Sequence, residues 1–142
     1  MAACDHQTVY NHYEHTPVSG WEKNDSLIFN IPPLTENGVY KEEIGVRISG
    51  EYPFLGLQLI IEQTNLNTLE ERCDTLSCSL IDEQGNAKGR GVSQYQYMFH
   101  LTTQQLPANT PFHIAIRHDM KREILPGITD IGVKLSHQSP LE

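Results

Sequence analysis

The chain has no long apolar segment and few basic residues. Its longest apolar stretch is the short segment from Leu57 to Ile61, far below the ~18 residues that a membrane-spanning helix needs. Ten Lys and Arg stand against eighteen Asp and Glu, a formal net charge of −8, and the basic residues are scattered instead of lining one face. This charge distribution argues against nucleic acid as a partner.

Motifs of enzymes and metal sites are also missing. The sequence contains no phosphate-binding glycine loop ahead of Lys and Ser or Thr, no Gly-x-Ser-x-Gly turn and no paired-histidine helix motif. His6, His12 and His15 gather near the N-terminus, but they lack the tight spacing of a metal site. We therefore expect a non-catalytic protein without metal or cofactor.

The length of 142 residues fits one domain. We assign residues 1–15 to an N-terminal arm and residues 16–140 to a single folded domain. Leu141-Glu142 resembles the scar in front of a purification tag and is left out of the fold prediction.

Apolar residues recur at every second position, which is the period of β-strands because neighbouring side chains point to opposite faces of a sheet. Turn residues separate the runs, as at Pro32-Pro33 and Pro126-Gly127. The pattern predicts an all-β fold, an antiparallel, jelly-roll-like β-sandwich of seven or eight strands. Asn65 to Arg72 and Asp119 to Ile124 have the composition of a helical turn. The seven clear runs are centred on Phe29, Val46, Leu59, Cys78, Tyr97, Ile114 and Val133, and Thr8 to Tyr13 is a candidate for the eighth.

The three cysteines call for separate interpretations. In one continuous strand Cys73 and Cys78 would lie ~16 Å apart, whereas a disulfide needs ~4.4–6.8 Å. Cys78 shares the parity of Leu76 and Leu80, which favours a buried free thiol, and Cys73 stays undecided. Cys4 follows a small residue and precedes a polar stretch, as in a bacterial lipoprotein after removal of its signal peptide; an incidental cysteine is the alternative.

A series of short motifs resembles one known family, the gliding motility lipoprotein H (GldH) family of Bacteroidetes. The most specific stretch runs from Met120-Lys121-Arg122 through Leu125, Gly127-Ile128, Asp130 and Ile131-Gly132. Weaker matches stand in the same order as in the family: Cys4-Asp5, Val9-Tyr10, Gly20-Trp21, Arg47, Tyr52-Pro53-Phe54, Asp74-Thr75-Leu76, Asp82 through Gly85, Gly89 and Gly91. The resemblance implies a non-enzymatic envelope lipoprotein, acylated at Cys4, periplasm-facing and working with other envelope proteins.

Arg47, Met120, Lys121 and Arg122 are the candidate partner contacts. Arg47 alternates with core residues, so it faces away from the core. Lys121 and Arg122, with Arg117 and His118, form the only local basic cluster of an acidic chain. The alternative is that Met120 and Leu125 plug one end of the sandwich and merely hold a charged loop.

A second function is a carbohydrate-binding module of jelly-roll type, with a glycan as partner. Tyr95, Tyr97 and Phe99 share one sheet face, and such a row can stack on sugar rings, with Trp21 as a further contact. The alternative is that the row belongs to the core. For Asp82 and Asp130, which precede glycine-bearing turns, we expect hydrogen bonds to the local backbone.

Overall fold

The structure is a computed structural model, which describes residues 6–80 and 94–138. Cys4, the motif residues from Asp82 to Gly91 and the final Leu141-Glu142 lie outside the described residues. The described part contains no helix, and therefore no helix that could cross a membrane. Its ten strands are β1 (His6–His15), β2 (Trp21–Glu22), β3 (Leu27–Ile31), β4 (Gly38–Ser49), β5 (Gly56–Asn65), β6 (Glu71–Ser79), β7 (Gln94–Leu106), β8 (Phe112–His118), β9 (Ile124–Leu125) and β10 (Ile128–Gln138).

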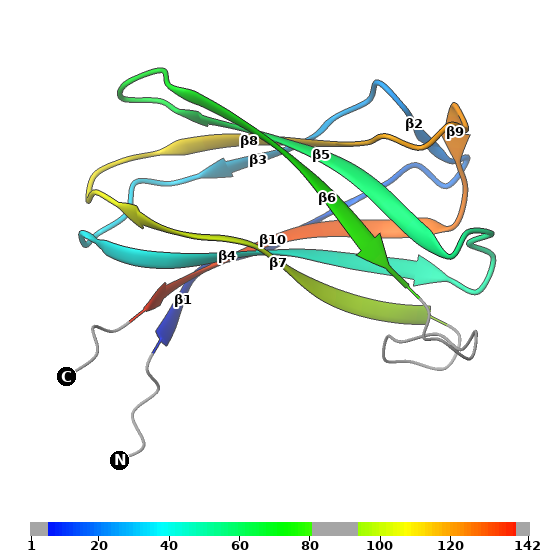
Figure 1. Cartoon of the computed structure of the whole chain (residues 1–142), viewed down its shortest axis with the longest axis horizontal. Helices are drawn as coiled ribbons and strands as arrows, with labels where there is room; N and C mark the ends of the chain where they lie inside the picture. Colours follow the sequence, from blue (N-terminus) through cyan, green and yellow to red (C-terminus); the bar gives the residue numbers. More distant parts are fainter. Residues whose placement is uncertain (1–5, 81–93, 139–142) are drawn as a thin grey trace, which may run out of the picture.

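Two four-stranded sheets pack face to face (Figure 1). The first sheet has the strand order β1-β10-β4-β7, and the second has the order β3-β8-β5-β6. Every pairing is antiparallel. Without the two-residue strands β2 and β9, eight strands alternate between the sheets except at the β5–β6 hairpin, in the manner of a jelly roll. The predicted β-sandwich is confirmed.

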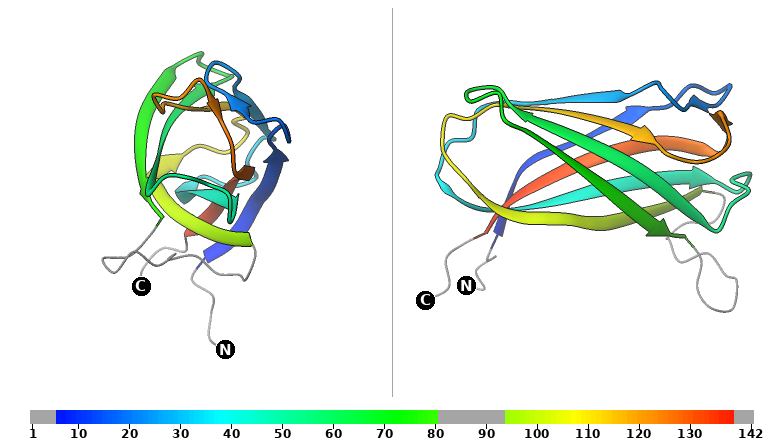
Figure 2. Two further views of the ribbon diagram at one scale, coloured as in Figure 1. Left: turned by 90° about the vertical axis from the view of Figure 1, so that its right-hand side faces the viewer. Right: turned by 45° about the horizontal axis from the view of Figure 1, so that its top comes forward.

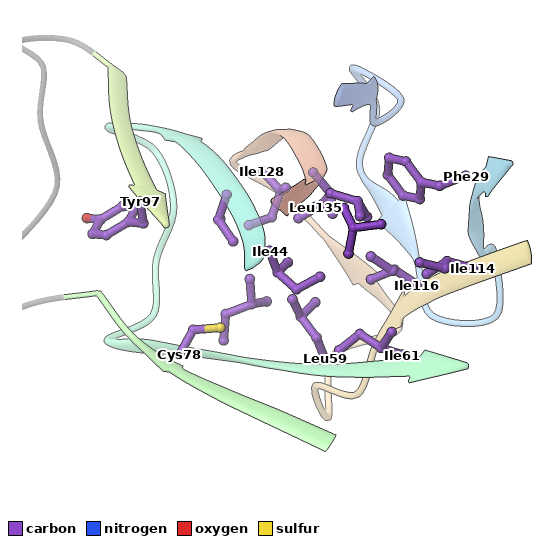
Figure 3. Close-up of a cluster of buried hydrophobic side chains, with 14 of the residues drawn as sticks. Phe29, Ile44, Leu59, Ile61, Cys78, Tyr97, Ile114, Ile116, Ile128 and Leu135 are labelled. Carbon is purple, nitrogen blue, oxygen red and sulfur yellow. The ribbon is translucent and has the colours of Figure 1, made fainter. Parts of the chain in front are cut away.

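The core consists of the inward-facing residues of the alternating runs (Figure 3). Ile44, Val46 and Ile48 of β4 face Leu57, Leu59 and Ile61 of β5, and all six are buried. The same layer is completed by five buried residues of β8 and β10: Ile114, Ile116, Ile131, Val133 and Leu135. Each of these runs was predicted from its period of two.

Strand β1 takes up most of the segment that the sequence analysis assigned to an arm. It pairs with β10 from His6↔Gln138 to His15↔Asp130 and forms the edge of the first sheet. The register shifts between Thr8 and Tyr10. Such a bulge breaks the alternation of side chains, which explains why this strand has the weakest sequence signal.

The two ends of the sandwich differ in what they carry (Figures 1 and 2). The terminal end holds the start of β1, the end of β10 and the connections 32–37, 66–70 and 107–111. The far end holds the connections 16–20, 50–55 and 119–127 together with the β2–β9 pair. At ~3.3 Å per residue, strands of ten to twelve residues separate these ends by roughly 30–40 Å.

Neither segment with helical composition is a helix. At the terminal end, Asn65 Oδ1 accepts hydrogen bonds from the backbone N–H groups of Asn67 and Thr68 at 2.9 and 3.1 Å. This Asx turn closes the hairpin between β5 and β6. At the far end, the segment from Asp119 to Ile124 is irregular until β9 begins.

Candidate functional site

Arg47 lies on the outer face of the first sheet, as its parity predicts. The register places it beside Asp130 of β10 and Gln96 of β7. Its Nε donates to Gln96 Oε1 at 2.9 Å, and its Nη1 lies 4.0 Å from Asp130 Oδ2. The guanidinium carbon stacks 3.8 Å from the ring centroid of Tyr13. Three side chains thus hold Arg47 in one orientation, and a third of its side chain remains exposed.

Two glycines make room for the Tyr13 ring. Gly45 and Gly132 are paired across β4 and β10, and Tyr13 is paired with Gly132. A Cβ atom at Gly45 or Gly132 would meet the Tyr13 side chain at 2.3 or 2.7 Å. Burial raises the pKa of the Tyr13 phenol; the nearby Arg47 lowers it and Asp130 raises it. Tyr13 is therefore a neutral, packed ring that supports Arg47.

Asp130 differs from its prediction. It lies within β10, not in a turn, and its carboxylate contacts the His15 imidazole and Arg47 instead of the local backbone. Its side chain is 7% exposed, whereas that of His15 is 88% exposed. Asp130 and His15 border a cavity of about 450 Å³ at the far end, which the connections 16–20 and 50–55 also line, through Val18 and Glu51.

Met120 and Leu125 are anchored to the body of the sandwich. Met120 is half-buried against the core, and its Sδ accepts a hydrogen bond from the Gln58 N–H at 3.3 Å. Leu125 is fully buried in β9 and pairs with Trp21 of β2. The chain then turns at Gly127, whose φ is +91° and where a Cβ would lie 2.5 Å from the Tyr52 Cα. These residues close the far end of the sandwich.

The predicted basic cluster is divided by the structure. His118 is buried, its Nε2–H donates to the Trp21 carbonyl at 2.9 Å, and burial lowers its pKa, so it is neutral. Arg117 pairs with Glu62 at 2.9 Å on the second sheet. Lys121 and Arg122 remain exposed at the far end. The positive charge of this cluster is therefore carried by Lys121 and Arg122.

Exposed apolar side chains accompany Lys121 and Arg122 at the far end. Four of the large exposed apolar residues lie on its connections and on β9: Val18, Phe54, Leu55 and Ile124. Larger groups of such residues mark surfaces for protein contact. Arg47 contacts Tyr13, Gln96 and Asp130. Of these residues, Asp130 borders the cavity at the far end.

A model of the GldH lipoprotein family matches residues 8–135, which is nearly the full length of the chain. The chain belongs to the GldH lipoprotein family. This confirms the resemblance drawn from the motifs. Members are envelope lipoproteins associated with gliding motility, anchored to a membrane through lipid, and the family is not a known enzyme family.

No curated protein matches the sequence. Among solved structures, a tumour necrosis factor homologue, Eiger from S. frugiperda, is similar with 13% identity and a TM-score of 0.41, covering 96% of each chain. The GH115 4-O-methyl-α-glucuronidase BtGH115A is similar with 13% identity and a TM-score of 0.45, over 91% of this chain and 17% of the enzyme. Neither likeness bears on the function of this GldH-family chain.

The aromatic row of the proposed glycan platform faces the core of this GldH-family sandwich. Tyr97 is buried, and its hydroxyl donates a hydrogen bond to the Leu80 carbonyl at 2.9 Å. Its ring stacks on Phe99 with 6.0 Å between the ring centroids. Tyr95 packs against the same core. Trp21 is fully buried, and its Nε1–H donates to the Asp25 carbonyl at 2.7 Å. The row therefore cannot act as a sugar-stacking surface.

The two described cysteines are free thiols. Cys78 is buried as predicted, and burial raises its pKa to about 12, which keeps the thiol protonated and unreactive. Cys73 pairs with Glu62 across β5 and β6 and is exposed. This register settles the open question of Cys73: it lies in the same continuous strand as Cys78, five residues away, and not in a turn that could bring the two sulfur atoms together.

One polar cluster was missed by the sequence analysis. Glu42 of β4 is buried on the inner face, and Gln63 Nε2 of β5 donates to Glu42 Oε1 at 2.7 Å. Burial raises the pKa of Glu42 to about 7; the Gln63 hydrogen bond and Arg72 lower it, and Asp74 raises it. A signal was present, because Glu42 lies two residues before Ile44 and shares the parity of the core residues.

Proposed function

We propose that this chain is a non-catalytic envelope lipoprotein, anchored through Cys4, which binds other envelope proteins through the far end of its sandwich. The match to the GldH lipoprotein family carries the proposal. The partner contacts are Arg47, Met120, Lys121 and Arg122, of which Lys121 and Arg122 are the exposed charges of the far end.

The position of Cys4 supports this orientation. Only Asp5 separates Cys4 from the first residue of β1, so an acyl chain on Cys4 holds the terminal end close to the membrane. The far end then points away from the lipid, at a distance of roughly 30–40 Å. An interaction surface at that end is free to meet a partner that is not itself in the same lipid layer.

The chemistry of the far end suits a protein partner. Lys121 and Arg122 provide charge for carboxylates, and Arg adds a planar donor fork. Met120 is half-buried next to Lys121 and Arg122. Its flexible thioether adapts to small shifts of neighbouring atoms. Val18, Phe54, Leu55 and Ile124 supply apolar area on the same end.

Reversing both charges, Lys121→Glu with Arg122→Glu, is expected to abolish co-purification with envelope partners after crosslinking in cells. The fold should stay intact, because exposed substitutions usually change the free energy of unfolding by less than ~0.5 kcal/mol. The control for net charge is Lys41→Glu with Lys134→Glu on β4 and β10 of the first sheet. Its melting temperature is measured as well, because Lys41 pairs with Glu43 at 3.7 Å and Lys134 lies opposite Glu43. Unchanged crosslinks in the far-end variant, together with an unchanged melting temperature, would refute the site.

A further inference from the structure

A polar layer interrupts the apolar inner face of the sandwich near the terminal end, where Tyr40 and Phe112 continue the core beyond it. In β4 the core residues Ile44, Val46 and Ile48 are preceded at the same parity by Glu42. In β5 the run of Leu57, Leu59 and Ile61 is followed by Gln63. A buried charged group costs free energy unless it is paired and hydrogen-bonded, so a polar layer at this place needs a reason.

The edge strands β6 and β7 complete this polar layer. They are the last strands of the two sheets on the same side of the sandwich, and Arg72 of β6 reaches across to β7. Its Nη1 donates to Gln104 Oε1 at 3.1 Å, and its Nη2 donates to Thr102 Oγ1 at 3.2 Å. Its Nε donates to Asp74 Oδ2 at 2.8 Å. The charge of Arg72 is thereby neutralised within the layer.

A cavity of about 510 Å³ opens beside this layer, between the β5–β6 hairpin and the end of β7. Small-molecule sites in proteins measure roughly 300–1,000 Å³. Its lining includes four amide side chains, Gln63, Asn65, Gln104 and Gln105, and the apolar residues Leu106, Pro107 and Phe112. The lining therefore combines paired donors and acceptors with an apolar wall.

We propose that this cleft binds a neutral, hydroxyl-rich ligand of one or two sugar rings. Each sugar hydroxyl both donates and accepts. This matches the Nε2 donor of Gln104, whose carbonyl accepts from Arg72, and the Oε1 acceptor of Gln63, whose Nε2 donates to Glu42. The apolar ring face of a sugar fits against the exposed ring of Pro107, whereas Leu106 and Phe112 are more than nine-tenths buried and contribute only small exposed areas. Glu70 and Glu71 line the cavity together with Arg72, whose charge is paired with Asp74, so the lining disfavours anionic ligands. The site uses none of the core-facing aromatics of the discarded platform, and it is distinct from the far-end partner surface.

The competing explanation is that the layer only fixes the spacing of the two sheets, because buried polar groups can serve specificity of packing without binding anything. The two explanations predict different ligand binding in solution. A structural layer takes up no ligand, whereas a sugar site shows saturable binding whose affinity depends on Gln104.

The test is a titration of the full chain with glucose, galactose, mannose and N-acetylglucosamine, one probe at a time, followed by amide chemical shifts. We expect at least one probe to give saturable shifts at Gln63, Gln104 and Gln105. Gln104→Ala should weaken that binding about 3- to 10-fold, the loss of one hydrogen bond. Mapping on the unaltered chain gives a result even where Gln104→Ala lowers the stability of the fold.

Gln58→Ala is the matched control, since Gln58 lies on β5 with one side-chain hydrogen bond, from Ser77 Oγ at 2.9 Å, and is exposed on the outer face. The Gln58→Ala variant should bind the sugar with the same affinity as the parent chain. The proposal is overturned by an absence of saturable shifts with all four sugars, by shifts confined to residues outside the cleft, or by equal weakening in the Gln58→Ala and Gln104→Ala variants.

Discussion

Trp21→Ala is expected to lower the free energy of unfolding by about 3–5 kcal/mol, the cost of removing a large aromatic side chain from a packed interior. Trp21 is fully buried, although it belongs to a strand of only two residues. Its ring packs edge-on against His118 at 5.3 Å, and its backbone pairs with Leu125 of β9. The far end depends on this residue, because both short strands and the His118 ring converge on it.

Urea unfolding of Trp21→Ala and Trp21→Phe measures this effect. The phenylalanine variant keeps an aromatic ring but leaves the Asp25 carbonyl without its donor, so it should lose less stability than the alanine variant. Leu55→Ala is the control on the same end, since Leu55 is 69% exposed and should change stability by less than ~0.5 kcal/mol. A Trp21→Ala loss no greater than that of Leu55→Ala would show that the far end does not depend on this ring.

Glu42→Gln is expected to stabilise the protein at alkaline pH. Burial raises the pKa of Glu42 in the folded protein to about 7, from an ordinary value of 4.5. Between these two pH values the folded chain holds a proton that the unfolded chain has released, so stability falls as the pH rises through this window. At about 1.4 kcal/mol for each unit of pKa difference, the loss above the folded pKa is about 3 kcal/mol.

The glutamine carries no charge at any pH and still offers an oxygen to the Gln63 donor. The gain in unfolding free energy over the parent chain should therefore be close to zero near pH 4 and about 1–3 kcal/mol near pH 8.5. Glu62→Gln is the control, because Glu62 is half-exposed on the outer face and paired with Arg117, a kind of pair that contributes little. An equal gain at both pH values would contradict the buried carboxylate as its source.

The period of two was enough to predict the sheets but not their ends. The seven clear runs form strands because each has three or four apolar residues on one face. Every strand of a sheet that packs against a second sheet needs such a face. β2 and β9 have two residues each, too few for a period, and their existence follows from the packing of Trp21 and Leu125. The bulge at Thr8 and Tyr10 likewise concealed the length of β1.

For the candidate surfaces, the alternation of residues predicted which side chains share a sheet face but not what covers that face. Alternation showed that Tyr95, Tyr97 and Phe99 share a face, but which face is covered is decided by the second sheet. Arg47 was correctly expected on the outer face, yet its bond to Gln96 and its stacking on Tyr13 join three strands distant in sequence. Glu42 was passed over because carboxylates are usually excluded from cores, although its parity was that of Ile44.

The anchor at Cys4 is the claim on which the proposed orientation rests, and acylation can be measured directly. The chain, expressed behind a lipoprotein leader peptide in a bacterial host fed an alkyne-tagged fatty acid, should carry the label and sediment with the membranes. Cys4→Ser should lose both the label and the membrane association, because stable anchoring requires covalently attached acyl chains. Cys73→Ser, which removes the exposed cysteine of β6, should keep both. A Cys4→Ser variant that remains labelled and membrane-bound to the same extent as the parent chain would contradict the account.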